Sequence, residues 1–342
     1  MKSLQQHPAW YGAVMGTGGL ALALSAESST WQLAWLEWLA RIGLVMTSVL
    51  AVILLPRYIA RLRDRSELAS ELGDPGHGAS LSTLPAGLLV SSIVWSKIGA
   101  PWLGTGIGLG VAAVLLVLGV VIAIVLGISW SSLILRATPG LEAVNGTWLI
   151  PPVMNLIVAV AIAPFVVAIP AWSTGLVLLA FAFFGIGLVL FLAMFTLLIA
   201  RLALRAPFPP PLAPSLWIPL APAGMIGVAL IRVQQAAEAA GVPGFTGTTL
   251  GVAVATMFVG LGFWWAAFAY VEFRRLRKAG AAVHPGWWGL VFPMGAMTIS
   301  IIVIGSTVGS VVVNVLGAIA TAVLVLVWLA VASATAKLSR KS

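Results

Sequence analysis

Long apolar segments separated by short polar breaks run through the whole chain. Ten of them are long enough to be membrane-spanning helices, because a helix needs about 20 apolar residues to cross the hydrocarbon core of a bilayer. Their approximate ranges are 9–26, 33–55, 81–99, 106–130, 147–169, 174–200, 213–233, 248–272, 286–305 and 308–333. Short breaks pair consecutive segments into five hairpins. The pattern therefore predicts an all-α integral membrane protein with ten transmembrane helices.

Proline recurs at a regular interval in the odd-numbered segments. The spaced prolines, about 70 residues apart, are Pro8, Pro85, Pro152, Pro222 and Pro293. Such a period favours one structural unit copied five times. We expect a single transmembrane domain over residues 1–342, with approximate repeats at 1–60, 78–135, 145–202, 213–278 and 284–337.

Proline inside a helix removes a backbone donor and bends the helix. The helix kinks expected on this basis lie at Pro85, Pro151, Pro152, Pro222 and Pro293. Five bent odd-numbered helices, surrounded by five straighter even-numbered ones, would line a central pore in quasi-fivefold arrangement. The alternative is that membrane helices tolerate proline without any such role.

Composition and charge support a membrane protein with a defined orientation. Charged residues make up 8% of the chain, whereas soluble domains carry about 25%. With the N-terminus inside, all but three of the 18 Lys and Arg residues fall on one side, and the exceptions are Arg41, Lys97 and Arg232. The positive-inside rule then predicts a multi-pass protein of the cell membrane with both termini in the cytoplasm. The net charge of +9 reflects this topology and does not indicate a nucleic-acid partner.

The longest polar stretch and the first apolar segment also affect the predicted topology. The longest polar stretch, from Arg57 to Ser80, is expected to be a loop. The first apolar segment, which ends in Leu24-Ser25-Ala26, also has features of a weak signal peptide. We favour a retained first helix, because the repeat requires a first hairpin.

The chain offers little for catalysis. It has no cysteine, which excludes disulfides and thiolate sites. Its three histidines, His7, His77 and His284, lie in flanks or loops, so we expect no metal site and no cofactor. The nine acidic residues lie in loops or near helix ends, whereas proton- or sodium-coupled carriers usually keep an ionisable group within the membrane. The sequence therefore favours passive flux over coupled transport, and it does not favour an enzyme.

Aligning the repeats on their prolines gives candidates for the pore. Leu84, Pro151, Ala221 and Phe292 then occupy equivalent positions. Phe292 is the only aromatic residue of this set, and it either blocks a narrow apolar constriction or packs like any core phenylalanine. The small polar residues of the odd segments have two alternative roles: they either line the pore or form hydrogen bonds between helices. They are Thr17, Ser91, Ser92, Asn155, Thr298 and Ser300. Lys97 and Arg232 are either cations of an outer vestibule or side chains that reach for the interface.

Three segments resemble a known family. They are residues 287–295 (WWGLVFPMG), residues 145–153 (NGTWLIPPV) and the opening 7–18 (HPAWYGAVMGTG). They are similar to the ninth, fifth and first helices of the tellurite-resistance/dicarboxylate transporter family, which includes plant guard-cell slow anion channels and the yeast malate permease. The resemblance implies five hairpins with the odd helices lining a pore, a homotrimer, and a phenylalanine plug that Phe292 matches. It also implies small anionic substrates: chloride, nitrate, malate or another C4-dicarboxylate, and sulfite.

The leading interpretation is a passive anion channel or uniporter whose pore is gated by Phe292. A proton-linked dicarboxylate or sulfite exporter is the alternative. The expected partners are a small anion, the lipid bilayer and further copies of the chain. The resemblance does not extend to the long regulatory tails of the plant members, because this chain has none.

Overall fold

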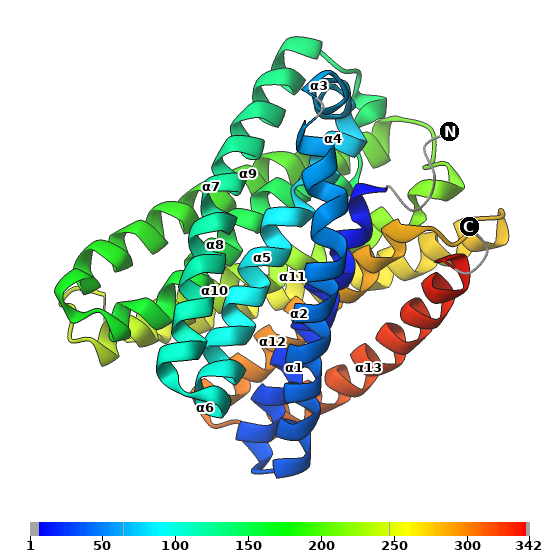
Figure 1. The fold of residues 1–342 in the computed structure, drawn as a ribbon. Coiled ribbons are helices and arrows are strands. Elements are labelled where there is room, and N and C mark those ends of the chain that lie inside the picture. Colours follow the sequence, from blue (N-terminus) through cyan, green and yellow to red (C-terminus); the bar gives the residue numbers. More distant parts are fainter. Residues whose placement is uncertain (1–6, 64, 246, 340–342) are drawn as a thin grey trace.

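The chain folds as five helical hairpins, as predicted. The computed structural model describes residues 7–63, 65–245 and 247–339. The hairpins are α1 (Gly12–Trp31) with α2 (Ala34–Arg63), α5 (Thr83–Val94) with α7 (Thr105–Ala137), α8 (Ile150–Ala168) with α9 (Ser173–Leu204), α10 (Leu220–Ala239) with α11 (Thr249–Lys278), and α12 (Trp288–Val308) with α13 (Val311–Ser339). A π-helical turn, η3 (Trp95–Gly99), and α6 (Ala100–Leu103) extend α5. Figure 1 shows these helices packed side by side.

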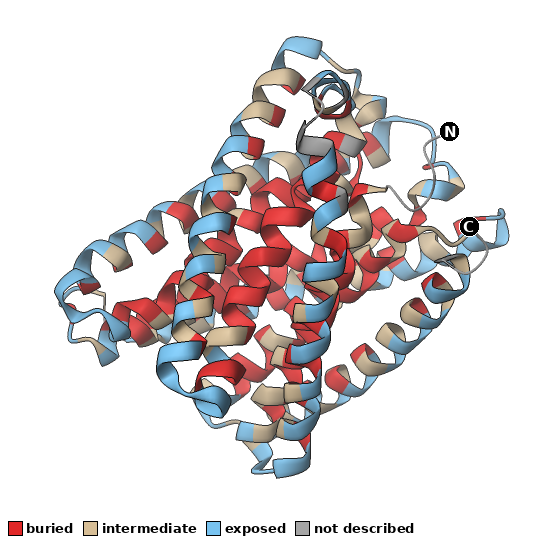
Figure 2. Cartoon of the chain, viewed as in Figure 1, coloured by how far each residue is buried: buried red, intermediate tan, exposed pale blue. Residues whose placement is uncertain are grey.

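The first helix of each hairpin belongs to an inner ring. Contacts run from α1 to α5, then to α8, α10 and α12, and return to α1, so the ring is closed. The membrane-spanning windows of the last four are 94%, 83%, 89% and 72% buried, whereas those of the second helices are only 22–28% buried. Figure 2 shows the resulting buried centre with exposed helices around it. This arrangement confirms the predicted membrane fold with odd helices inside.

Apolar composition agrees with this assignment. Within the part of the chain that the structure describes, nine helices are long and apolar enough to cross a membrane. The tenth, α1, is less apolar because it carries glycines, serines and Glu27. It is nevertheless part of the inner ring, where its contacts with α5 and α12 bury most of its residues.

Small residues let the helices approach closely. A Cβ atom added at Gly224 of α10 would lie 2.5 Å from the carbonyl carbon of Ala296 in α12. One added at Gly43 of α2 would lie 2.6 Å from the Cβ atom of Ala21 in α1. Packing of this kind replaces the hydrophobic effect as the main attraction between helices in lipid.

Most of the repeated prolines stand at helix starts. Pro151 and Pro152 are in the first turn of α8, and Pro85 and Pro222 are each the third residue of their helices. The first four amide groups of a helix have no partner within it, so proline costs little there. Of the five prolines at which a kink was expected, only Pro293 lies inside its helix, α12. The expectation of a kink therefore applies to Pro293, and the other four positions mark helix starts instead.

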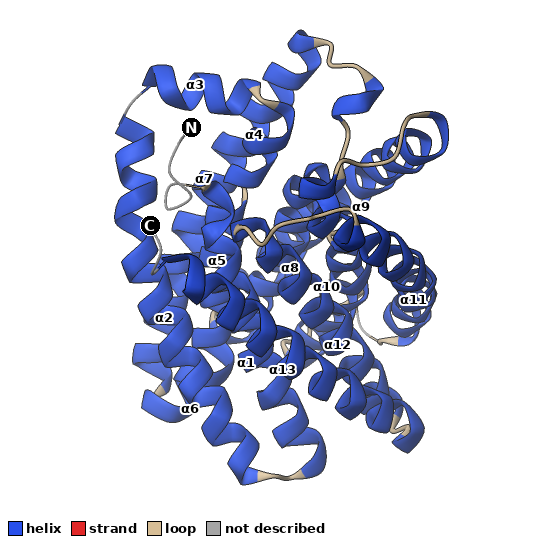
Figure 3. Ribbon diagram, turned by 90° about the vertical axis from the view of Figure 1, so that its right-hand side faces the viewer, coloured by secondary structure: helices blue, strands red, loops and turns tan. Residues whose placement is uncertain are grey.

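The polar stretch from Arg57 to Ser80 is not a loop, and that expectation was wrong. Helix α2 continues to Arg63, and α3 (Arg65–Gly73) and α4 (Pro75–Leu81) follow. The buried residues Leu72, Ala79 and Leu81 attach these short helices to the bundle. A few apolar positions at helical spacing are enough for this packing. Figure 3 shows α3 turned away from the direction of α2.

All inner helices run in the same direction. We call the side where α1 begins and α13 ends the terminal side, and the opposite side the far side. Arg41, Lys97 and Arg232 belong to the far side, as predicted from the sequence. The described basic residues of the last turns of α7, α9, α11 and α13 belong to the terminal side. Lys2, Arg340 and Lys341 lie outside the described residues.

Candidate functional site: two chambers divided by Phe292

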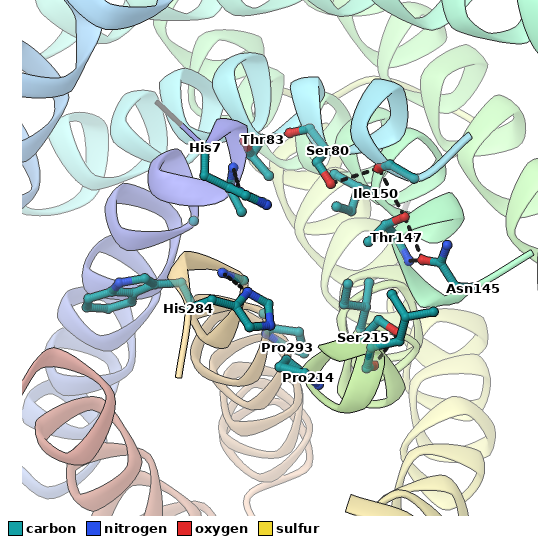
Figure 4. Close-up of a pocket in the computed structure, with 18 of the residues that line it drawn as sticks. His7, Ser80, Thr83, Asn145, Thr147, Ile150, Pro214, Ser215, His284 and Pro293 are labelled. Atoms are coloured by element: carbon teal, nitrogen blue, oxygen red, sulfur yellow. Dashed lines mark hydrogen bonds between the residues drawn. The ribbon is translucent and has the colours of Figure 1, made fainter. Parts of the chain in front are cut away.

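A chamber of about 420 Å³ opens on the terminal side, and we call it the terminal chamber. The short turns that precede the inner helices form its wall. Its polar and charged lining residues are His7, Asp74, Ser80, Thr83, Glu142, Asn145, Thr147, Ser215 and His284. Figure 4 shows several of these side chains around the chamber.

Side-chain caps organise these turns. Asp74, Asn145 and His284 each accept a hydrogen bond from the amide group two residues ahead, and His7 does the same. Thr83 donates to the carbonyl oxygen of Pro8 at 3.0 Å, which ties the start of α5 to the segment before α1. The polar groups of the wall therefore fix the starts of the inner helices.

A second chamber of about 670 Å³ lies on the far side, and we call it the far chamber. Two cationic side chains, Lys97 and Arg232, line it together with Gln235. Arg232 donates to the side-chain oxygen of Gln235 at 2.9 Å. Among the lining residues in the described ranges there is no carboxylate. The chamber therefore carries positive charge without a fixed counter-ion on its wall.

Phe292 divides the two chambers. It is the single residue of the described chain that lines both. On α1, α8 and α10 the last lining residue of the terminal chamber and the first of the far chamber are four positions apart: Met15 and Gly19, Val153 and Ile157, Ala221 and Met225. The division is thus about one helical turn, or roughly 5.4 Å, thick. We call this level the neck.

The Phe292 ring is buried, with 6% of its surface exposed. It faces a glycine of α1, since a Cβ atom added at Gly19 would lie 3.7 Å from its Cδ2 atom. Val90, Ile157 and Met225 are the apolar residues of the far chamber nearest to this level. In general, a narrow apolar constriction can oppose the entry of ions by dewetting.

Comparison with known proteins agrees with this architecture. The model of the SLAC1 family, described as voltage-dependent anion channels, matches residues 5–336. The chain belongs to the SLAC1 family. An uncharacterized transporter of Methanocaldococcus jannaschii is 29% identical over 86% of this chain and 82% of its own length. The sulfite efflux pump SSU1 of Arthroderma otae is 25% identical over 96% of this chain and 89% of its own. This SLAC1-family chain is therefore an anion transporter of the membrane, in a family of channels and transporters.

The six small polar residues proposed for the pore of this SLAC1-family protein line neither chamber. Thr17 accepts a hydrogen bond from the indole of Trp328 in α13, and Ser92 donates to the carbonyl oxygen of Ala112 in α7. Ser91 and Asn155 donate to carbonyl groups one turn earlier in their own helices. Thr298 and Ser300 are buried. The bonds of Thr17 and Ser92 favour the alternative role for these two residues, in which polar groups hold membrane helices together.

The acidic residues within the described ranges do not form a relay along the chambers. Glu27 is buried near the far end of α1, where it accepts hydrogen bonds from Trp31 at 2.7 Å and Thr321 at 3.1 Å. Its carboxylate thus points toward α13. Glu142 lines the terminal chamber and pairs with Arg205 at 2.9 Å.

Sequence reasoning missed the histidines of the terminal chamber. His7 and His284 both line it, with ring centroids 6.2 Å apart. The side chain of His77 lies outside the description. A usable signal was present in the sequence, because His7, Asp74 and His284 each directly precede a proline. A residue that can cap, followed by proline at the first helical position, is typical of a helix start.

Proposed function

We propose that the protein is a passive anion channel or uniporter whose pathway runs from the terminal chamber through the neck to the far chamber. Phe292 is its gate. One observation carries this assignment: Phe292 is the single residue in the described chain that borders both chambers. The proposed substrates are chloride, nitrate, malate or another C4-dicarboxylate, and sulfite.

The charge of the far chamber supports an anion as the permeating species. Lys97 and Arg232 line the same chamber, where like charges repel each other, and no carboxylate from the described residues joins them on the wall. An anion between them would relieve that repulsion. A chamber lined by one sign of charge also raises the local concentration of the opposite ion.

A proton-linked dicarboxylate or sulfite exporter is the second candidate. It is favoured by the similarity to SSU1, which is named a sulfite efflux pump. Coupling would need a group that binds a proton during transport. Glu27 is the buried carboxylate of the inner ring, but its hydrogen bonds tie it to α13 and not to either chamber.

We propose further that the terminal side is cytoplasmic and that the protein resides in the cell membrane, because most basic residues lie on that side. The five hairpins would then be copies of one ancestral unit within a single domain. A homotrimer with one pathway in each protomer is also part of the proposal. The lipid-facing apolar surfaces of α7, α9, α11 and α13 are available for such assembly.

The reversal potential of the purified protein in a planar bilayer tests the proposal. Under a chloride gradient the potential should follow the chloride equilibrium potential, and replacement of chloride by nitrate, malate or sulfite should rank the substrates. A pH gradient at equal chloride on both sides should produce no current. Uptake of labelled sulfite driven by a pH gradient alone, without any conductance, would instead establish the exporter.

A further inference from the structure

Four of the five hairpins are preceded by the same capping turn, and two of the four caps are histidines. The Asp74 turn starts α4, which leads into α5. Asp74 and Asn145 accept an amide hydrogen bond through a side-chain oxygen, at 3.0 Å in both turns. His7 and His284 accept theirs through Nδ1, from Ala9 and Gly286, at 3.1 Å in both turns. A carboxylate, an amide and two imidazoles therefore perform one structural task. The imidazoles precede α1 and α12, the two helices that meet beside Phe292.

Both ring nitrogens of His284 are engaged in its neutral form. The amide of Gly286 can only donate, so Nδ1 carries no proton. Nε2 lies 3.0 Å from the carbonyl oxygen of Pro211, which can only accept, so Nε2 carries the proton. A second proton on Nδ1 would point at the amide proton and break the cap. Burial lowers the pKa of His284 below its usual value, and the hydrogen bond to Pro211 acts in the opposite direction.

The imidazole of His7 lies near that of His284, so protonation of both rings has a larger effect than protonation of one. Figure 4 shows His7 and His284 on the side of the chamber away from Asn145, and their ring centroids are 6.2 Å apart. Protonation of both would place two positive charges near each other and break both caps. The repulsion between them would act on the junction between α1 and α12.

Described charged groups near this pair come from α11 and from the wall of the chamber. Arg277 of α11 stacks on Trp287, 4.7 Å from the ring centroid. Asp74 and Glu142 line the same chamber, and Glu142 is paired with Arg205. The turn η7 (Pro210–Trp217), which packs against the turn of His284, contains no charged residue.

The start of α12 is mechanically linked to the neck. Phe292 follows His284 by eight residues, or about two helical turns. A Cβ atom added at Gly16 of α1 would lie 2.9 Å from Val291, so α1 and α12 are in close contact beside the ring. A shift at the start of α12 is thus passed to Phe292.

We propose that His7 and His284 form a proton-sensitive latch, which holds Phe292 in the neck while both rings are neutral and releases it when they are protonated. This inference rests on the proposed role of Phe292 as the gate. The direction of the pH effect follows from the caps. The closed form is stabilised at pH values above the usual pKa of histidine, and it loses that stabilisation as the pH falls. The added positive charge also attracts anions into the terminal chamber. Both effects raise anion flux at acidic pH.

The chain itself supplies the matched variant for a test. Asn145 makes the same cap with a side chain that does not titrate, so H7N and H284N should keep the turns and lose the proton sensitivity. Loss of one cap corresponds to about a fivefold change in an equilibrium constant. We expect the chloride current of the wild type to rise about fivefold or more between symmetric pH 7.5 and pH 5.5, and that of the double variant to stay nearly constant. Chloride does not titrate in this range, so the substrate is unchanged.

Hydrogen exchange separates failure of the latch from failure of the gate. At acidic pH the amides of residues 286–291 should exchange faster in the wild type than in the double variant, and at pH 7.5 the two proteins should exchange alike. A pH response of current and exchange that persists in the double variant overturns the latch. If F292A leaves the current unchanged at every pH, the gate assignment fails, and the exchange measurement alone decides on the latch.

Discussion

Replacement of Phe292 by alanine should join the two chambers into one passage. The neck is about one helical turn thick, roughly 5.4 Å, and Phe292 is the residue that spans it between chambers of about 420 and 670 Å³. Removal of the benzyl ring frees far more than the roughly 10–15 Å³ that one water needs. Gly19, which faces the ring, has no side chain with which to fill the gap. Water should therefore enter the neck of the variant.

A wetted neck lowers the barrier that an anion meets. Moving a charge into an apolar region without compensation costs many kcal/mol, and each 1.4 kcal/mol removed from a barrier raises a rate about tenfold. Relief of even a small part of that cost gives at least about a tenfold increase in chloride current. Truncation of a packed phenylalanine costs about 3–5 kcal/mol of stability. We expect a cost near the lower end of that range, because Phe292 borders two cavities.

Bilayer recording of a graded series checks this reasoning. Current should rise from wild type to F292L to F292A, while F292W should stay closed. Phe183 of α9 provides the control, since it is as buried as Phe292, 7% against 6% exposed, but lines neither chamber. F183A should lose stability without gaining current. Equal currents in wild type and F292A, with normal expression, would refute the assignment of the gate.

Two further variants test the charges of the inner ring. Combined Lys97→Gln and Arg232→Gln replacement should lower conductance mainly at low salt, where screening is weak, and an equal loss in bilayers at high and low salt would indicate a folding defect. Glu27→Gln should keep the hydrogen bond from Thr321, and a pH gradient alone should drive no flux through this variant or through the wild type, whereas Glu27→Leu should reduce the melting temperature. Loss of gradient-driven uptake in Glu27→Gln would contradict the passive mechanism.

The membrane fold follows from the sequence because its signal is long-range and redundant. Each spanning helix repeats an apolar run, and the bias of Lys and Arg is spread over many positions. Short helices give a weaker signal. Helices α3 and α4 were predicted as loop because the stretch from Arg57 to Ser80 is polar overall, and only a few positions such as Leu72 and Ala79 are buried.

The site was only partly predictable for a related reason. Phe292, Lys97 and Arg232 line the chambers, as the sequence suggested, because their helix and their depth in the membrane follow from the repeat. The direction in which a side chain points around the axis of an inner helix does not follow from the repeat. Every face of such a helix is apolar, so periodicity could not show that Thr17 and Ser92 bond to outer helices. The histidine caps were missed because their role depends on turns whose geometry the sequence only hints at.

Selectivity and gating should reside in different residues. Lys97 follows Val90, and Arg232 follows Met225, by seven positions, so the cations lie about 10 Å beyond the neck. That distance is close to the screening length at 0.1 M salt, so the charges act on an ion in the far chamber and not on an ion at the ring. F292A should therefore conduct more while keeping the chloride-to-sodium permeability ratio of the residual wild-type current. A variant that passes sodium as readily as chloride would show that the aromatic neck itself takes part in selectivity.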